Sequence, residues 1–124
     1  MLGNQAQAAI ATTLLDPISA ANTAAATSGW IDVRDAEGDL MFTVQVGTLT
    51  GSITWTIQDA TDSSGTGAAG ITPNEGAFAA GAANQIQKRT INASAVRGWV
   101  RVVGTIVTGP ALVAANIKRH SKYV

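Results

Sequence analysis

The stretch Leu40-Met-Phe-Thr-Val-Gln-Val-Gly-Thr-Leu-Thr-Gly-Ser-Ile-Thr-Trp-Thr-Ile-Gln-Asp59 decides the fold class of this chain of 124 residues. In its first half, large apolar residues occupy every second position from Leu40 to Val46. In its second half, Ile53, Trp55 and Ile57 repeat the alternation. Period two over two runs, with a Gly-bounded turn between them, predicts an antiparallel hairpin with one buried and one wet face.

The rest of the chain contains further segments of the same kind, separated by residues typical of turns and loops. About six or seven short strands predict an all-β fold, a small antiparallel β-sandwich or jelly-roll-like barrel, over residues 29–124. In the last strand we expect Val113, Ala115 and Ile117 to face the core. The last strand is expected over 111–120, and the other expected strands are 29–33, 68–71, an edge strand over 84–91, and 98–106.

Residues 1–28 differ in composition from the rest, with nine alanines, one charged residue (Asp16) and no aromatic residue. Short alanine-rich helices are marginal in water, so we expect an extended N-terminal arm. Two alternatives stand: a solvated tail, or an arm ordered by packing on a partner or on its own domain. Its apolar anchors for a partner are Ile10, Leu14, Leu15 and Ile18.

Composition excludes several classes of protein. The sequence has no cysteine, and hence no disulfide or thiolate chemistry. No apolar run is long enough to span a bilayer, and the N-terminus lacks the pattern of a secretory signal, so we expect synthesis in the cytoplasm and no membrane partner. A net charge of zero argues against direct nucleic-acid binding. Since 23 of the apolar residues are alanine, the core is lean, and we expect a partner or self-association to add stability.

The charges are unevenly distributed along the chain. All eight acidic residues precede residue 76, and seven of the eight basic residues follow residue 87. Interleaved strands from the two halves would neutralise these charges locally. Alternatively, an acidic patch on one copy would meet a basic patch on the next.

Two motifs resemble ligand sites. Gly65-Thr-Gly-Ala-Ala-Gly70 matches the dinucleotide fingerprint, but Pro73 prevents the helix that the pyrophosphate would need, so we expect a glycine-rich loop. Asp59 to Gly65 offers oxygen ligands for calcium but lacks a bidentate acid at its far end, which favours an ordinary turn. We expect no metal and no cofactor.

Catalytic groups are also scarce. His120 is the sole histidine and no acid follows Glu75, so a serine triad would need an acid brought round in space. We expect a solvated histidine and no enzymatic activity. A small esterase or carbohydrate-binding enzyme is the alternative that turnover of model esters would support.

Arginine and tryptophan alternate near the C-terminal end. In Arg97-Gly-Trp99-Val-Arg101 the indole and the second guanidinium fall on one strand face, where they would form a cation–π pair. Two interpretations stand: a core Trp99 covered by arginine stems, or a partner-contact surface. With Trp30, we name Arg97, Trp99 and Arg101 as candidate partner contacts.

These segments together resemble the small head decoration, or cement, proteins of tailed bacteriophages. The resemblance spans residues 29–118, and the chain departs from it at the spacing of 58–62 and in the loop 65–83. The matching segments are Gly29-Trp-Ile-Asp-Val33, Leu40–Gly47, Ser52–Asp59, Asp62-Ser-Ser-Gly65, Asn84–Arg89, Arg97-Gly-Trp-Val-Arg-Val-Val103 and Ala111–Lys118.

The resemblance implies a non-enzymatic virion protein on the outer capsid surface. Its partner would be the major capsid protein, and it would act as a homo-oligomer, a dimer or a trimer, at symmetry axes of the shell. Such proteins brace the shell against the pressure of packaged DNA. Another virion part, such as a tail or neck subunit or a receptor-binding module, is the alternative.

Overall fold

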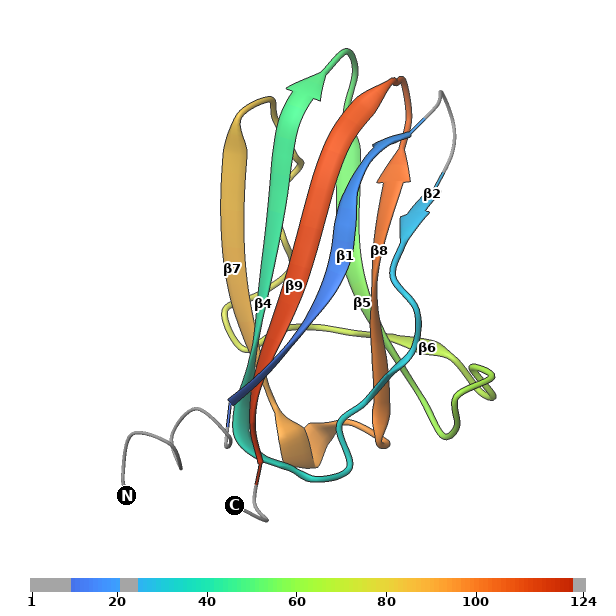
Figure 1. The fold of residues 1–124 in the computed structure, drawn as a ribbon, viewed down its shortest axis with the longest axis vertical. Coiled ribbons are helices and arrows are strands. Elements are labelled where there is room, and N and C mark those ends of the chain that lie inside the picture. Colours follow the sequence, from blue (N-terminus) through green and yellow to red (C-terminus); the bar gives the residue numbers. More distant parts are fainter. Residues whose placement is uncertain (1–9, 21–24, 122–124) are drawn as a thin grey trace.

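Two antiparallel sheets packed face to face form the molecule (Figure 1). The computed structural model describes residues 10–20 and 25–121. One sheet, sheet A, has the strand order β1-β9-β4-β7, with β1 Ile10–Ala20, β9 Ala111–Ser121, β4 Ala36–Leu49 and β7 Gln85–Asn92. The prediction of an all-β antiparallel sandwich is confirmed, as is the position of β7 at a sheet edge.

The second sheet, sheet B, contains shorter strands. Its order is β2-β8-β5-β6, with β2 Ala25–Thr27, β8 Trp99–Ile106, β5 Ile53–Ala60 and β6 Ala69–Ile71. The two-residue strand β3, Ile31–Asp32, also pairs with β8. A single turn of 3-10 helix, η1 at Ala93–Ala95, links β7 to β8, and the Asn92 side chain caps it by accepting from the Ser94 N–H.

The expected hairpin of residues 40–59 is wrong, although both of its strands exist. β4 pairs with β9 and β7 in sheet A, whereas β5 pairs with β8 and β6 in sheet B. The turn between them crosses from one sheet to the other. The alternation of apolar and polar residues shows which face of a strand is buried. It does not show whether two such strands pair within one sheet or pack against each other from opposite sheets, because the same face is buried in both arrangements.

The crossing turn packs against a second crossing turn, which links β8 to β9. The Val107 N–H donates to the Ser52 carbonyl over 3.0 Å. At Gly51 a Cβ would lie 2.3 Å from Cβ of Thr108, so only glycine fits between the two turns. Contacts between these two turns, which are far apart in sequence, therefore accompany the crossing of β5 to the opposite sheet. A local sequence pattern contains no information on such contacts.

The core lies between the sheets and contains the residues that alternation assigned to it. Leu40 and Phe42 of sheet A and Ile53 of sheet B are fully buried, and Trp55 is 2% exposed. Gly104 stands opposite Trp55 on β8, and a Cβ there would lie 2.8 Å from Cζ3 of the indole. The missing side chain at 104 makes room for the largest residue of the core.

The described part of the expected N-terminal arm lies along its own chain. β1 pairs with β9, and Ile18 stands opposite Val113, whose side chain is buried. The register shifts between Leu15 and Ile18, at Asp16-Pro17, where proline has no N–H for the ladder. Of the alternatives for the arm, packing on its own domain is the one in the structure, so strands begin before Gly29.

Candidate interaction surface

The outer face of sheet B carries the arginine and tryptophan residues identified in the sequence. Val100 and Val102 of β8 point into the core and are 0% and 2% exposed. Trp99 and Arg101, which alternate with them, therefore point outward, and both are half-buried. We call Trp30, Arg34, Arg97, Trp99 and Arg101 the Arg–Trp surface.

Arg101 is held over Trp30. The Arg101 guanidinium carbon lies 4.5 Å from the centre of the Trp30 ring, and Nε donates to Oε1 of Gln58 over 2.8 Å. Gly65 supports the ring from the loop after β5. A Cβ at this glycine, whose φ is +82°, would lie 2.7 Å from the indole Nε1. Glycine is therefore required at 65 for both its conformation and its space.

Arg34 is held over Trp99. Its guanidinium carbon lies 5.3 Å from the ring centre, and its Nη2 makes an ion pair of 2.7 Å with Asp32. This hydrogen-bonded guanidinium lowers the pKa of Asp32. The expected pairing of Arg101 with Trp99 is therefore wrong: β3 lies beside β8 with Asp32 opposite Trp99, which brings Arg34 to this indole instead.

Arg97 connects β5 and the loop that follows it to the start of β8. It donates to both carboxylate oxygens of Asp59, at 3.0 and 2.8 Å, and its Nη2 also donates to the carbonyls of Asp59 and Gly67. The Asp59 carboxylate is buried, with 7% of its side chain exposed, and the bound guanidinium lowers its pKa. Arg97 thus fixes the end of β5 and the following loop to the start of β8.

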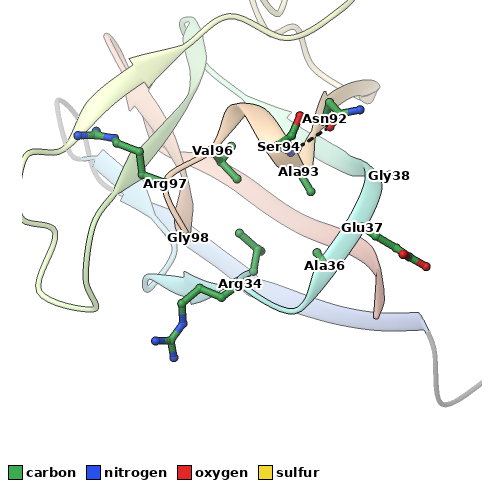
Figure 2. A pocket seen from close by; sticks show the side chains of 11 residues that line it. Arg34, Ala36, Glu37, Gly38, Asn92, Ala93, Ser94, Val96, Arg97 and Gly98 are labelled. Atoms are coloured by element: carbon green, nitrogen blue, oxygen red, sulfur yellow. Dashed lines mark hydrogen bonds between the residues drawn. The ribbon is translucent and has the colours of Figure 1, made fainter. Parts of the chain in front are cut away.

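A pocket of about 610 Å³ continues the surface at the end of the sandwich, beside η1 (Figure 2). Small apolar side chains, Ala36, Ala93 and Val96, lie at its centre, and Arg34 and Arg97 extend outward at its rim. Gly98 closes one side: its φ is +110°, and a Cβ would lie 3.0 Å from Cγ of Arg34. An apolar floor with a charged rim is the usual anatomy of a protein–protein contact.

Ion pairs join the acidic first half of the chain to the basic second half. Asp59 binds Arg97, Asp35 binds Arg119, and Glu37 lies 3.3 Å from His120. Local neutralisation between interleaved strands is therefore the interpretation that the structure supports for the uneven charge distribution.

The sequence-predicted partner contacts fall into two groups. Trp30, Arg97, Trp99 and Arg101 come together on one surface. The four arm anchors lie in β1, where only the backbone is described: Ile10, Leu14, Leu15 and Ile18 stand opposite His120, Asn116, Ala115 and Val113. Their side chains lie outside the described residues, so their role as contacts stays a prediction.

Three residues of the surface were missed in the sequence. Arg34 and Gln58 hold the two stacks, and Gly65 supports Trp30. The alternation of Asp32 with Arg34 places both on one strand face and is a weak signal for their ion pair. Gln58 is identified by the pairing of β5 with β8, which places it opposite Arg101, and this pairing was not predicted from the sequence. The contact of Gly65 with Trp30 has no signal in the local sequence.

The two motifs of the Gly-rich region form turns. The Asp62 carboxylate accepts from the backbone N–H groups of Ser64 and Thr66, and this hydrogen bonding lowers its pKa. The segment after Gly65-Thr-Gly67 continues into strand β6 rather than a helix. Within residues 10–20 and 25–121, no group of three acidic or histidine side chains is placed to hold a metal ion. The same residues contain no helix long and apolar enough to cross a membrane.

Comparisons with known proteins concern the fold. No protein-family model matches the chain, and no curated protein matches it significantly. The crystal structure of PirA is similar with a TM-score of 0.51 and 9% identity, covering 87% of this chain and 91% of PirA. The SPBc2 prophage-derived protein YomS is similar with a TM-score of 0.46 and 16% identity, covering 88% and 94% of the two chains.

A subunit of Bacillus endospore appendages gives a TM-score of 0.45 and 16% identity, covering 91% of this chain and 89% of that one. At 9% identity the likeness to PirA shows a shared sandwich fold alone.

Proposed function

We propose that this chain is a structural protein of a tailed-bacteriophage virion, which binds the outer surface of the capsid and cements neighbouring major capsid subunits. The observation that carries the proposal is the Arg–Trp surface. Tryptophan and arginine are the residues that most often dominate binding energy at protein interfaces. Here each guanidinium is already held in place, so little conformational freedom is lost when a partner binds.

The geometry supports a binding role for Arg101 in particular. Arg34 and Arg97 each pair with a carboxylate of the same chain, whereas Arg101 contacts the amide of Gln58 and the ring of Trp30. An arginine side chain has five N–H donors, and one of them is used by Gln58. Its terminal nitrogens can therefore bind a carboxylate of a capsid subunit in a bidentate manner.

The resemblance of residues 29–118 to phage cement proteins supports the choice of partner. In this proposal the protein is not an enzyme, and a dimer or trimer bridges several subunits at a symmetry axis. Separating the subunits then requires several weak contacts to break together, which raises avidity without a large interface.

Capsid shells that lack the protein provide the test. Purified protein is added to the shells, and the bound copies and the melting temperature of the shells are measured. We expect saturable binding that raises the melting temperature, and a large loss of binding for Arg101→Gln. Binding to tails or necks, with none to shells, would contradict the proposal and support the alternative virion part.

A further inference from the structure

A cleft opens at the side of the sandwich, between β5 and the connection from β6 to β7. Figure 1 shows this connection running from β6 across the sandwich to the β7 side. On that side it is firmly held: the Gln87 amide makes two hydrogen bonds with the backbone of Ala79, at 2.9 and 3.0 Å, and Arg89 Nε donates to the Gly76 carbonyl. The connection reaches β5 through the Gly81 N–H, which donates to the Ile53 carbonyl over 2.8 Å.

Between its attachments to β7 and to β5, the connection leaves a pocket of about 330 Å³ next to β5. Its walls are mainly apolar, and none of its lining residues is charged. The residues that define it are Trp55, Ile57, Ile71, Thr72, Pro73 and Phe78. A pocket of this volume and composition suits a small uncharged ligand.

The indole of Trp55 brings a hydrogen-bond donor to this pocket. Its Cε3–Cζ3 edge packs toward position 104 of β8. The Nε1 atom is on the opposite edge of the ring and therefore faces away from β8, toward the cleft side of β5. Trp55 is 2% exposed, and its Nε1 has no hydrogen-bond acceptor among the described residues. A buried N–H without an acceptor is unfavourable and is relieved by any group that supplies one.

We propose that this cleft binds a small, uncharged and mainly apolar ligand with one acceptor oxygen, which accepts the hydrogen bond of Trp55 Nε1. The apolar walls provide the affinity, and the indole N–H orients the ligand. The proposal does not depend on the capsid-binding function, since the cleft shares no lining residue with the Arg–Trp surface.

Acetophenone is a suitable probe, and α-methylstyrene is its isostere without the acceptor oxygen. Each is titrated into the full-length, nitrogen-15-labelled protein, and the three indole N–H signals are followed by NMR. Trp30→Phe and Trp99→Phe identify the Trp55 signal by elimination and leave the core intact. We expect acetophenone to produce a saturable downfield shift of the Trp55 proton, and α-methylstyrene, which binds the same walls without the hydrogen bond, to produce no downfield shift.

Two loop variants sharpen the test. Ala77 lines the cleft and Ala79 does not, although both are exposed in the same connection. Ala77→Leu fills the cleft and is expected to weaken acetophenone binding by about tenfold or more, whereas Ala79→Leu leaves it unchanged. A Trp55 signal that does not respond to acetophenone, or responds equally to both compounds, would overturn the proposal.

Discussion

The outer faces of the two sheets hold their side chains in different ways. On sheet B, Arg34 and Arg101 are stacked on indoles and hydrogen-bonded to Asp32 and Gln58, and Arg97 is hydrogen-bonded to Asp59. On sheet A, Thr43 lies between Lys88 and Asn116, and Met41 between Thr90 and Lys118. The cation–π pair of this sheet, Arg89 over Phe78, is on the inner face, since Arg89 stands opposite the buried Phe42. The comparison separates a face whose cations are held in place from one without a cation–π pair among the described side chains, on which Ile86 and Leu112 are exposed.

The largest difference between the faces is expected from Asp59→Ala. The variant leaves Arg97 without its partner and releases the loop after β5, so the free energy of unfolding should fall by about 2–4 kcal/mol. The matched change on sheet A is Thr43→Val, at a buried position of the outer face, with an expected change below about 1 kcal/mol. Urea unfolding measures both free energies. Equal losses of stability for the two variants would contradict the difference between the two faces.

The contribution of Asp59 to stability is expected to depend on pH. Because Arg97 lowers the pKa of Asp59, the carboxylate contributes its full stabilisation above the unfolded-state pKa of about 3.9 and loses it as the pH falls below that value. Asp59→Asn removes this contribution. The stability gap between wild type and variant should therefore be largest near pH 7 and should narrow as the pH falls below about 4. A gap that stays constant with pH would show that the ion pair is not its source.

Gly65→Ala should have the next largest effect. It places a Cβ against the Trp30 ring at a positive φ, and we expect a loss of about 2 kcal/mol with a displaced indole. Gly70→Ala is the control, since a Cβ there meets nothing within 4 Å. Thermal unfolding reports the stability and the Trp30 indole NMR signal reports the ring. A Trp30 signal identical to wild type would contradict the support assigned to Gly65.

Arg101→Gln should change stability by less than about 1 kcal/mol, because an exposed cation–π pair contributes little. Its effect on shell binding should be much larger, about tenfold or more. Lys88→Gln on sheet A removes one positive charge from the other face and should change neither quantity. Similar losses of binding for both variants would indicate a nonspecific charge effect instead of a defined contact.

The sequence predicted buried faces well and strand partners poorly. Leu40, Phe42, Ile53 and Trp55 are buried as alternation requires, because a two-residue period is a local property of the chain. The pairing of β5 with β8 depends on the contact of Gly51 with Thr108, more than fifty residues away. The local pattern therefore predicted a hairpin over residues 40–59, whereas the chain crosses there from sheet A to sheet B.

The same limit applies to the candidate surface. The choice between core and surface for Trp99 stayed open in the sequence, although the shared strand face of Trp99 and Arg101 could be predicted from the strand period. Their stacking partners could not, since Arg34 and Trp30 reach β8 through the position of a two-residue strand. Composition alone has no information on which guanidinium covers which indole.

Oxidative footprinting on capsid shells tests the central claim most directly. Hydroxyl radicals oxidise exposed tryptophan and methionine side chains. Trp30 and Trp99, on the Arg–Trp surface, are compared with Met41 of sheet A in free and shell-bound protein. The account predicts strong protection of both tryptophans on binding and unchanged oxidation of Met41. Protection of Met41 with unchanged oxidation of Trp30 and Trp99 would contradict it and would assign the contact to the opposite face.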